Sequence, residues 1–426
     1  MTTANPDTEL ALYCDQLASK AQAASRALTR HTGAERDQAL REMAQAILDH
    51  RKQLQAENAL DLEAGQENQL SSAMLDRLAL TDARIDLIAE SLRQVASQPD
   101  PVGRIESGKV LPNGIRLQKR RVPIGVVLII FESRPNVTSD AASLCLKAGN
   151  AAILRGGKEA RHSNAIIASC VRQGLTAAGL PIDAVQLVEV SDRAAVGELL
   201  SKEGLIDVCI PRGGESLIRA VVEQSRIPVI KHYTGNCHLY IDASADPDMA
   251  VEIAINAKTH RTGVCNATET LLIHQQAFDR GIGKRIIEAL LAEQVEIRGD
   301  VPIQSLADSV KPATDLDWAT EYLDRILAVR VVEDLDQAID HINRYGSRHT
   351  DAIVTSDLQA ADRFTNEVDT ANAFVNCSTR FSDGFQYGLG AEIGISTDKL
   401  HARGPMGADD LTTTQWVAYG QGQIRP

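Results

Sequence analysis

Gly125-Val-Val-Leu-Ile-Ile-Phe131 is a wholly apolar run of strand length, and it opens a region in which strand-like and helix-like patterns alternate up to residue 230. A strand that is apolar on both faces is typical of a parallel sheet that helices cover on both sides. We expect helices at residues 160–178 and 215–224. The alternation predicts an α/β domain with a parallel sheet. Further strands of this sheet are expected at residues 151–154, 186–190, 207–210 and 229–230.

Polar stretches follow three of these strands, at residues 132–136, 155–159 and 211–215. Ligands of such sheets bind at the carboxyl ends of the strands. The second and third stretches hold a Gly-Gly pair beside Arg or Lys, which lets a helix N-terminus approach an anion closely. Neither matches the GxGxxG fingerprint, and Gly-Gly between strand and helix is often only a turn, so a nucleotide phosphate site and plain turns both stay open. Arg155 and Arg212 would suit a cofactor with a 2′-phosphate.

A second informative stretch is residues 256–274, which contains Cys265 and ends in the apolar run Leu271-Leu272-Ile273. The pattern predicts a polar loop that presents a thiol and leads into a buried strand. Backbone N–H groups beside a nucleophilic cysteine can stabilise an oxyanion. A free cysteine is more often a small buried apolar residue. His260 and Arg261 would favour a thiolate if they fold near it, so a nucleophile and a structural cysteine both stay open.

Length, charge and cysteine content limit the possible classes of protein. The chain has 426 residues, 44% of them hydrophobic, and a formal net charge of −13. The length favours two or three domains, and the acidity argues against broad binding to nucleic acid or to an anionic membrane. Seven scattered cysteines without CxxC spacing indicate reduced thiols in the cytoplasm. We expect no signal peptide and no transmembrane helix, because neither pattern is found.

The first hundred residues show the periodicity of helices and nothing catalytic. Beyond them, Asn113-Gly114 stands between two extended arms within residues 107–122 and predicts a β-hairpin. The basic residues 119–121 favour a solvated face or a contact between subunits over a phosphate site. The tail at 412–418 alternates and is expected to pair as a strand. Three helical faces are expected: Leu40, Met43, Ala44, Ile47 and Leu48; Leu54, Leu60 and Leu62; Ile85, Ile88, Leu92 and Val95.

Residues 236–390 repeat the α/β pattern. Helices are expected at residues 278–291, after Asp334 and from Leu358. The loop at 378–390 is rich in Gly, Ser, Asp and aromatic residues and includes Arg380, and a loop of this kind after a buried strand is a candidate site. Strands are expected at 269–274, 326–332, 351–355 and 373–377.

Six longer motifs extend over nearly the whole chain. They are Phe-Glu-Ser-Arg-Pro-Asn at 131–136, Leu-Arg-Gly-Gly-Lys-Glu at 154–159, Ile-Pro-Arg-Gly-Gly at 210–214, Gly-Val-Cys-Asn-Ala at 263–267, Gly-Leu-Gly-Ala-Glu-Ile-Gly-Ile-Ser-Thr at 388–397 and His-Ala-Arg-Gly-Pro-Met-Gly at 401–407. In these motifs the sequence resembles the gamma-glutamyl phosphate reductases, also called glutamate-5-semialdehyde dehydrogenases, a family of the aldehyde dehydrogenase superfamily.

The resemblance implies an aldehyde-dehydrogenase-like fold: two α/β domains with mostly parallel sheets plus a small β oligomerisation element. An NADPH-binding domain would comprise residues 1–108 and 123–235, with 389–406 packing back on it. Residues 236–388 would form the catalytic domain. Residues 109–122 and 407–426 would form the oligomerisation element of a homodimer or homotetramer.

The resemblance also implies the activity: NADPH-dependent reduction of L-glutamyl 5-phosphate to L-glutamate 5-semialdehyde and phosphate in proline biosynthesis, through a thioester on Cys265. The enzyme would be cytoplasmic, with no nucleic-acid or membrane partner. An acyl phosphate is short-lived in water, so a transient contact with glutamate 5-kinase is also expected.

Site residues follow from the matched motifs. Cys265 would be the catalytic nucleophile, with Asn136 as the candidate side chain of the oxyanion hole. The cofactor-binding candidates are Ser133, Arg155, Gly156, Lys158, Arg212, Gly213, Gly214, Glu215 and Glu321, the last resembling the acidic residue that holds the nicotinamide ribose. The substrate-binding candidates are Arg134, Arg261, Asn266, Asn376, Ser378 and Arg380, of which Arg134 and Arg380 are chosen by charge alone.

One departure from the superfamily bears on the reaction. Tyr233 stands where hydrolytic aldehyde dehydrogenases carry the glutamate that activates water, which fits a reductase that never hydrolyses its thioester. A hydrolytic NAD(P)-dependent aldehyde dehydrogenase and a non-catalytic binding module remain the rival hypotheses. No metal is expected. The nearest metal-like set, His232, Cys237, His238 and His260, matches no zinc spacing.

Overall fold

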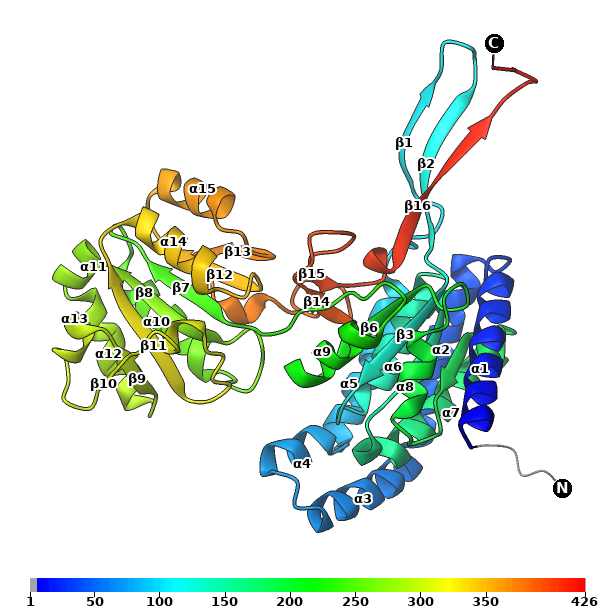
Figure 1. Ribbon diagram of the computed structural model, residues 1–426, viewed down its shortest axis with the longest axis horizontal. Coiled ribbons are helices and arrows are strands. Elements are labelled where there is room, and N and C mark those ends of the chain that lie inside the picture. Colours follow the sequence, from blue (N-terminus) through cyan, green and yellow to red (C-terminus); the bar gives the residue numbers. More distant parts are fainter. Residues whose placement is uncertain (1–5, 426) are drawn as a thin grey trace. The chain divides into compact units, whose positions relative to one another are not determined.

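The computed structural model describes residues 6–425, which form two compact units (Figure 1). The first unit contains the residues up to Lys231, together with 388–394 and the chain from Met406 onward. The second unit contains residues 232–387 and 395–405. Two short strands, β14 (Gly394–Ser396) and β15 (Gly404–Met406), pair where the chain passes between the units.

A four-stranded parallel sheet is the centre of the first unit. Its strand order is β5-β4-β3-β6, and the apolar run at residues 125–131 contains strand β3, which is buried along its whole length. The predicted parallel sheet is therefore confirmed, except that residues 229–230 form only an isolated bridge between Val229 and Cys209. The strands are β3 (Val126–Phe131), β4 (Ala151–Arg155), β5 (Val185–Leu187) and β6 (Val208–Arg212).

Helices cover the sheet of the first unit. α1 (Pro6–Leu28) and α8 (Ala194–Leu200) bury apolar side chains against its strands. α6 (Asn136–Lys147) and α7 (Arg161–Ala177) also pack on the sheet. The outer helices α2 (Gly33–Asp49) and α5 (Asp82–Ser97) bury the apolar faces expected from the sequence, against α7 and α6 respectively. The remaining helices are α3 (Arg51–Glu67), α4 (Ser72–Leu78) and α9 (Glu215–Gln224).

The face that α3 buries includes the predicted Leu54 but is otherwise mainly polar, so the predicted apolar face was wrong at Leu60. Leu60 is 47% exposed, whereas Asn58 and Asp61 are buried. The Asp61 carboxylate accepts hydrogen bonds from the backbone N–H groups of His162 and Ser163 and from the Ser163 hydroxyl. These N–H groups lie in the first turn of α7, where a helix leaves its donors unpaired. Asp61 therefore caps α7 from another helix.

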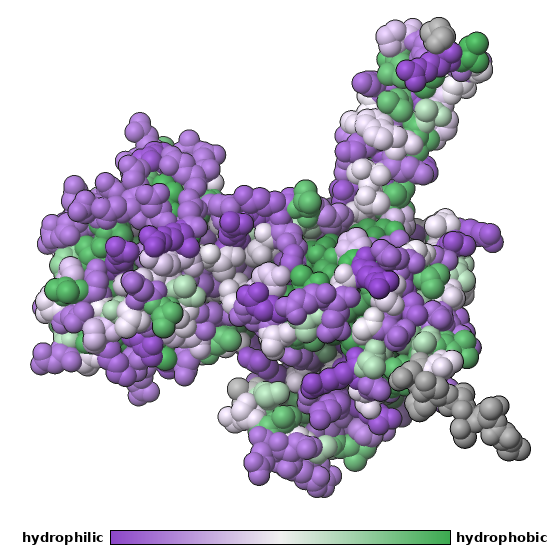
Figure 2. Space-filling view, viewed as in Figure 1, coloured by the Kyte–Doolittle hydropathy of each residue, from purple (hydrophilic) through white to green (hydrophobic). Residues whose placement is uncertain are grey.

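A three-stranded antiparallel arm extends from the first unit. β1 (Ile105–Val110) pairs with β2 (Arg116–Pro123), and β2 pairs with β16 (Thr412–Tyr419). Gly114 in the connecting turn has φ +85°, a conformation that favours glycine. The predicted hairpin and the predicted pairing of the tail are both confirmed. Hydrophobic side chains lie between hydrophilic ones on the arm's surface (Figure 2).

A seven-stranded sheet forms the centre of the second unit, in the order β10-β9-β11-β8-β7-β12-β13, with all pairs parallel. Successive residues of β8 face opposite cores: Leu271 and Ile273 face one, and Leu272 the other. The strands are β7 (Cys237–Ile241), β8 (Thr268–His274), β9 (Glu296–Gly299), β10 (Lys311–Pro312), β11 (Ile326–Val332), β12 (Thr350–Val354) and β13 (Asn372–Val375).

The helices of the second unit differ from expectation in two places. The helix predicted at 278–291 is two helices, because Gly281 between them has φ +83°. Residues 256–259, expected in the Cys265 loop, instead end a helix. The helices are α10 (Pro247–Thr259), α11 (Gln275–Asp279), α12 (Ile282–Ala292), α13 (Val301–Gln304), α14 (Leu335–Tyr345) and α15 (Leu358–Glu367). Within the described residues, no helix is both long and apolar enough to cross a membrane.

Candidate active site

Cys265 lies in the loop between α10 and β8 and is partly exposed. All seven cysteines are free thiols, and only Cys265 and Cys377 are not buried. The loop packs closely on Gly235: a Cβ at that position would lie 2.0 Å from the Cys265 carbonyl oxygen. Only glycine fits such an approach, so the segment before β7 helps to place the thiol.

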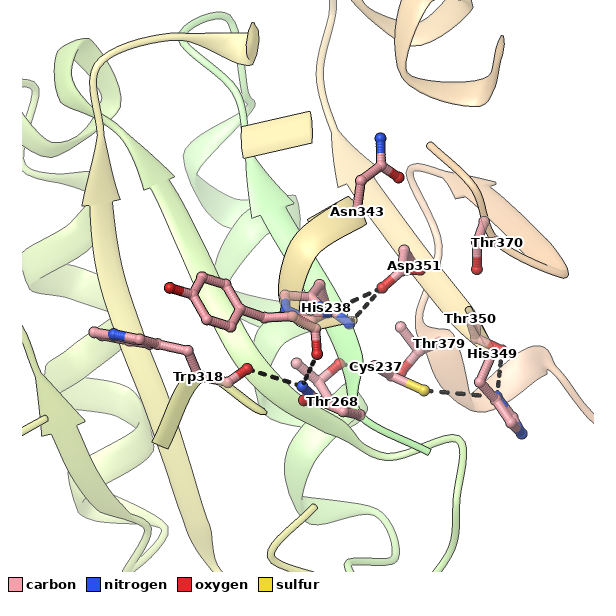
Figure 3. Close-up of polar contacts among 12 residues, drawn as sticks. Cys237, His238, Thr268, Trp318, Asn343, His349, Thr350, Asp351, Thr370 and Thr379 are labelled. Carbon is pink, nitrogen blue, oxygen red and sulfur yellow. Dashed lines mark hydrogen bonds and ion pairs between the residues drawn. The ribbon is translucent and has the colours of Figure 1, made fainter. Parts of the chain in front are cut away.

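A second cysteine, Cys237, bonds the backbone of the Cys265 loop. The buried Cys237 Sγ donates to the Cys265 carbonyl oxygen at 3.1 Å and lies 3.7 Å from His349 Nδ1 (Figure 3). Burial raises the pKa of Cys237 well above its ordinary value, with nearby carboxylates such as Asp351 adding to the effect. Cys237 therefore remains a neutral thiol and a structural hydrogen-bond donor rather than a nucleophile.

Two histidines lie beside the Cys265 sulfur. One ring nitrogen of His232, one of His349 and the Cys265 Sγ all lie within 4.8 Å of one another. The two rings meet edge to face with centroids 5.3 Å apart. The structure thus groups His232 with Cys265 and His349, and not with Cys237, His238 and His260 as in the set considered from the sequence.

His238 has a different role. It is fully buried, and its ring nitrogen Nδ1 lies 3.1 Å from Asp351 Oδ1, an atom that also accepts the His238 backbone N–H (Figure 3). His341 packs edge to face against His238, and burial lowers the pKa of His341 to about 2. These histidines belong to the packing between β7, β12 and α14.

The backbone around Cys265 offers donors to a reacting carbonyl. Within the described part of the chain, the N–H groups of Cys265 and Asn266 donate to no other residue. The Asn266 side chain is buried and donates to the Ser382 carbonyl at 2.8 Å, while Thr379 Oγ1 donates to the Asn266 carbonyl. Asn266 therefore ties the Cys265 loop to the 378–390 loop through its side chain and its carbonyl.

Two arginines bring positive charge to this part of the second unit. Arg380 Nε lies 3.4 Å from His260 Nδ1, and the exposed Arg261 is close enough to influence Arg380 electrostatically. Burial lowers the pKa of Arg380 from its ordinary value, and the charge of Arg261 acts in the same direction. The charge of Arg380 also reaches Cys265. This grouping suits an anionic substrate.

The other substrate candidates in this loop have structural partners. Ser378 is buried, and its hydroxyl accepts the Arg380 backbone N–H. Both polar atoms of the Asn376 side chain bond the Thr355 backbone at 2.9 Å, and Asn376 has φ +56°. Glu321, a cofactor candidate, accepts the Gly235 backbone N–H at 2.9 Å. Glu321 thus bonds the segment around Gly235, which packs on Cys265.

The first unit contains a cavity of about 610 Å³ between the carboxyl ends of β4 and β5 and the helix α7. Arg155, Gly156 and Lys158, three of the cofactor candidates, line it. Arg155 is held by hydrogen bonds to the Gly156 and Ser191 carbonyls, and burial lowers its pKa from the ordinary value. Arg161 and Arg172 add further positive charge to the lining. The cavity therefore suits a phosphorylated ligand.

The candidates after β6 lie outside that cavity lining. Gly213 and Gly214 precede α9, and the Gly214 N–H donates to Glu132 Oε2 at 3.0 Å. Arg212 lies 3.5 Å from Glu392, Glu215 pairs with Arg219, and Ser133 is buried. A carboxylate thus occupies the helix N-terminus that an anion would use. Glu132, which the sequence did not single out, is the residue that occupies it.

Asn136 begins α6 and Arg134 precedes this helix, both in the first unit, whereas Cys265 belongs to the second. Asn136 Nδ2 donates to Asp140 Oδ2 at 2.8 Å. Burial raises the pKa of Asp140 to about 6, against the opposing effect of hydrogen bonds from Asn136 and Ser91. The assignment of Asn136 to the oxyanion hole remains a prediction.

Comparison with known proteins identifies the family of the chain. Residues 8–304 match the family model of the aldehyde dehydrogenase family. The chain is 56% identical over 410 residues to a gamma-glutamyl phosphate reductase of Geotalea daltonii, covering 96% of this chain and 98% of that protein. The crystal structure of gamma-glutamyl phosphate reductase from Thermotoga maritima matches 97% of this chain and 100% of its own, with a TM-score of 0.93 and 41% identity. The corresponding enzyme structure from Saccharomyces cerevisiae matches 97% and 98%, with a TM-score of 0.54 and 30% identity. The chain therefore belongs to the aldehyde dehydrogenase family and, within it, to the gamma-glutamyl phosphate reductases.

Proposed function

We propose that this oxidoreductase reduces L-glutamyl 5-phosphate to L-glutamate 5-semialdehyde and phosphate with NADPH, as a step of proline biosynthesis. The observation that carries the proposal is the partly exposed Cys265 in a chain 56% identical to a gamma-glutamyl phosphate reductase. Two N–H groups of its loop donate to none of the residues that the structure describes. Arg261 and Arg380 beside the loop fit a substrate with negative charge.

The reaction begins at the Cys265 sulfur. As a thiolate it attacks the acyl carbonyl, whose oxygen becomes an oxyanion that the N–H groups of Cys265 and Asn266 stabilise. Phosphate, a good leaving group, departs and leaves a thioester on Cys265. Bound NADPH would supply a hydride to that thioester carbonyl. The same N–H groups hold the second oxyanion, and its collapse releases the semialdehyde and restores the Cys265 thiolate.

The residue in the position of the water-activating base supports reduction over hydrolysis. Tyr233 stands there, and a phenol hydroxyl lacks the carboxylate with which those enzymes take the proton of the attacking water. Without that carboxylate, water attacks the thioester less readily, which favours its reduction. The hydrolytic NAD(P)-dependent dehydrogenase is the rival that this argument disfavours.

NADPH is favoured over NADH by the cations of the first unit's cavity. Arg155, Lys158, Arg161 and Arg172 line it. A ribose 2′-phosphate has two charges that such a group can pair, and NADH lacks them. Titration of the chain with each cofactor tests this preference: equal affinity for NADH would contradict it.

The predicted division of labour is part of the proposal. Residues 1–108, 123–235 and 389–406 serve the cofactor, 236–388 the chemistry, and 109–122 with 407–426 the assembly of a homodimer or homotetramer. The cavity in the first unit and Cys265 in the second support it. Seven free thiols support a cytoplasmic location. Transient contact with glutamate 5-kinase follows from the instability of the acyl phosphate.

The reverse reaction tests the proposal. Purified chain is mixed with glutamate 5-semialdehyde and NADP⁺, and absorbance of the reduced nicotinamide is followed with and without phosphate. We expect NADP⁺ to be reduced only when phosphate is present. Cys265→Ala should abolish this activity, and Cys14→Ala, which changes a buried cysteine of the other unit, should retain it. Reduction without phosphate would establish the hydrolytic rival. Activity in Cys265→Ala would exclude the thioester.

A further inference from the structure

We propose that Cys265, His232 and His349 form a Zn²⁺ site, and that the bound ion blocks the nucleophile reversibly. The ligand set is already assembled: one atom of each residue lies within 4.8 Å of the other two. That the ion inhibits the enzyme rests on the proposed function. That it binds rests on this cluster alone.

The chemistry of the three side chains matches zinc. A thiolate and two imidazoles are ligands that Zn²⁺ prefers, and three protein ligands leave the fourth tetrahedral position to water. With bonds of about 2.3 Å to sulfur and about 2.0–2.1 Å to nitrogen, ligand atoms in a tetrahedral site lie roughly 3.5 Å apart. His232 and Cys265 are both partly exposed, so small side-chain rotations can bring their atoms to that separation.

His349 is held in the manner of a metal ligand. It is buried, and its Nδ1 lies 2.9 Å from Thr350 Oγ1 (Figure 3). Asn372 Nδ2 in turn donates to the His349 carbonyl at 2.9 Å and to Thr350 Oγ1 at 3.3 Å. Metal-binding histidines have one ring nitrogen oriented by such a partner and coordinate through the other. The ring is therefore oriented before any ion arrives.

The surroundings select the kind of ion. Arg380 is close enough to Cys265 for its charge to be felt there, so ions held by charge alone are repelled. Mg²⁺ and Ca²⁺ prefer oxygen ligands, which the cluster does not offer. Cys237 stays outside the set, because its Sγ is engaged with the Cys265 carbonyl and its pKa is raised. The site therefore favours Zn²⁺ and Co²⁺.

Binding consumes the nucleophile. A bond forms between the Cys265 sulfur and the ion, and the thiol proton is released to solvent. The sulfur electron pair that would attack the acyl carbonyl then lies in the metal bond. A chelator removes the ion and restores the thiol, with no change of oxidation state.

Cobalt titration of the untagged chain tests the site directly. Co²⁺ bound to a thiolate gives a charge-transfer band in the near ultraviolet, and tetrahedral Co²⁺ gives intense visible bands. We expect both for one Co²⁺ per chain, displaced by Zn²⁺ and unaffected by excess Mg²⁺. Cys265→Ser should abolish the charge-transfer band, and His232→Asn should weaken binding at least tenfold. His31→Gln, a histidine of the other unit, serves as the matched control and should change nothing.

Retention of the charge-transfer band in Cys265→Ser, or unchanged affinity in His232→Asn, would overturn the site. The partly exposed His232 carries the test if the buried His349→Asn variant fails to fold. Zn²⁺ should also inhibit turnover competitively with the acyl substrate, and chelator should reverse the inhibition. A chain that binds Co²⁺ as described but does not turn over glutamate 5-semialdehyde would refute the proposed function and leave the metal site standing.

Discussion

Lys258 and Glu269 form an ion pair in which both side chains are fully buried. The Glu269 carboxylate also accepts the Leu323 N–H at 3.1 Å. Removing one partner leaves an uncompensated buried charge, which costs about 3–5 kcal/mol. We therefore expect Lys258→Met and Glu269→Leu each to lower the free energy of unfolding by that amount, measured by chemical denaturation. In the double variant Lys258→Met/Glu269→Leu, the free energy of unfolding should fall much less than in either single variant. Additive losses would contradict the argument.

Asp140 makes the stability of the first unit depend on pH in an unusual direction. Burial raises its pKa to about 6, whereas an unfolded aspartate has a pKa of about 3.9. An acid that binds its proton more tightly when folded stabilises the fold at low pH and loses that contribution as pH rises. The free energy of unfolding should fall between about pH 4 and pH 6, by at most about 3 kcal/mol.

Asp140→Asn is the control for this pH effect, because the amide does not titrate. Denaturation of both chains at pH 4.5 and pH 6.5 gives the difference due to Asp140, since the other groups titrate equally in each. An identical pH dependence in the two chains would exclude Asp140 as the cause.

At the residue scale the sequence predicts Cys265 but not its neighbours. Cys265 stands out as a candidate nucleophile because polar residues and Gly263 precede it and an apolar strand follows. His349 and Cys237 are brought to it by the pairing of β7 with β8 and with β12. Such proximity across a sheet leaves no local pattern in the chain. Strand β7 (Cys237–Ile241) was not among the predicted strands.

At the scale of elements, a further prediction concerns the N-terminus of α9. The Glu132 carboxylate accepts the Gly214 N–H there, at the place where a cofactor phosphate would bind. Such a phosphate must displace the carboxylate and is repelled by its charge. Glu132→Gln should therefore tighten NADPH binding several-fold, measured by fluorescence titration. Glu159→Gln, a glutamate near the other Gly-Gly loop, is the matched comparison. Weaker binding in Glu132→Gln would show that Glu132 contacts the cofactor favourably.

Helices are predictable where their faces are apolar and not where they are polar. α2 and α5 bury apolar stripes that the periodicity of the sequence reveals. Besides Leu54, α3 buries Asn58 and Asp61, whose partners lie on α7 and at the end of α4. A carboxylate from a distant helix can bond the free N–H groups at a helix start as well as a local cap does. The acceptor and the donors then lie about a hundred residues apart, so no local sequence pattern contains both. The polar face of α3 could therefore not be inferred.

At the scale of the whole molecule, the arm of β1, β2 and β16 is the candidate contact with another copy of the chain. Trp416 is 58% exposed and Val110 68% exposed, and exposed apolar groups of this kind mark interaction surfaces. If the arm pairs with another copy of the chain, Trp416→Lys and Val110→Lys should lower the molar mass measured by light scattering. Neither side chain packs in a core, so the melting of the separate units should change little. Lys109→Glu, an exposed change beside Val110, separates the loss of apolar contact from a general effect of charge. An unchanged mass in both apolar variants would remove the arm from the assembly and leave its exposed side chains without that explanation.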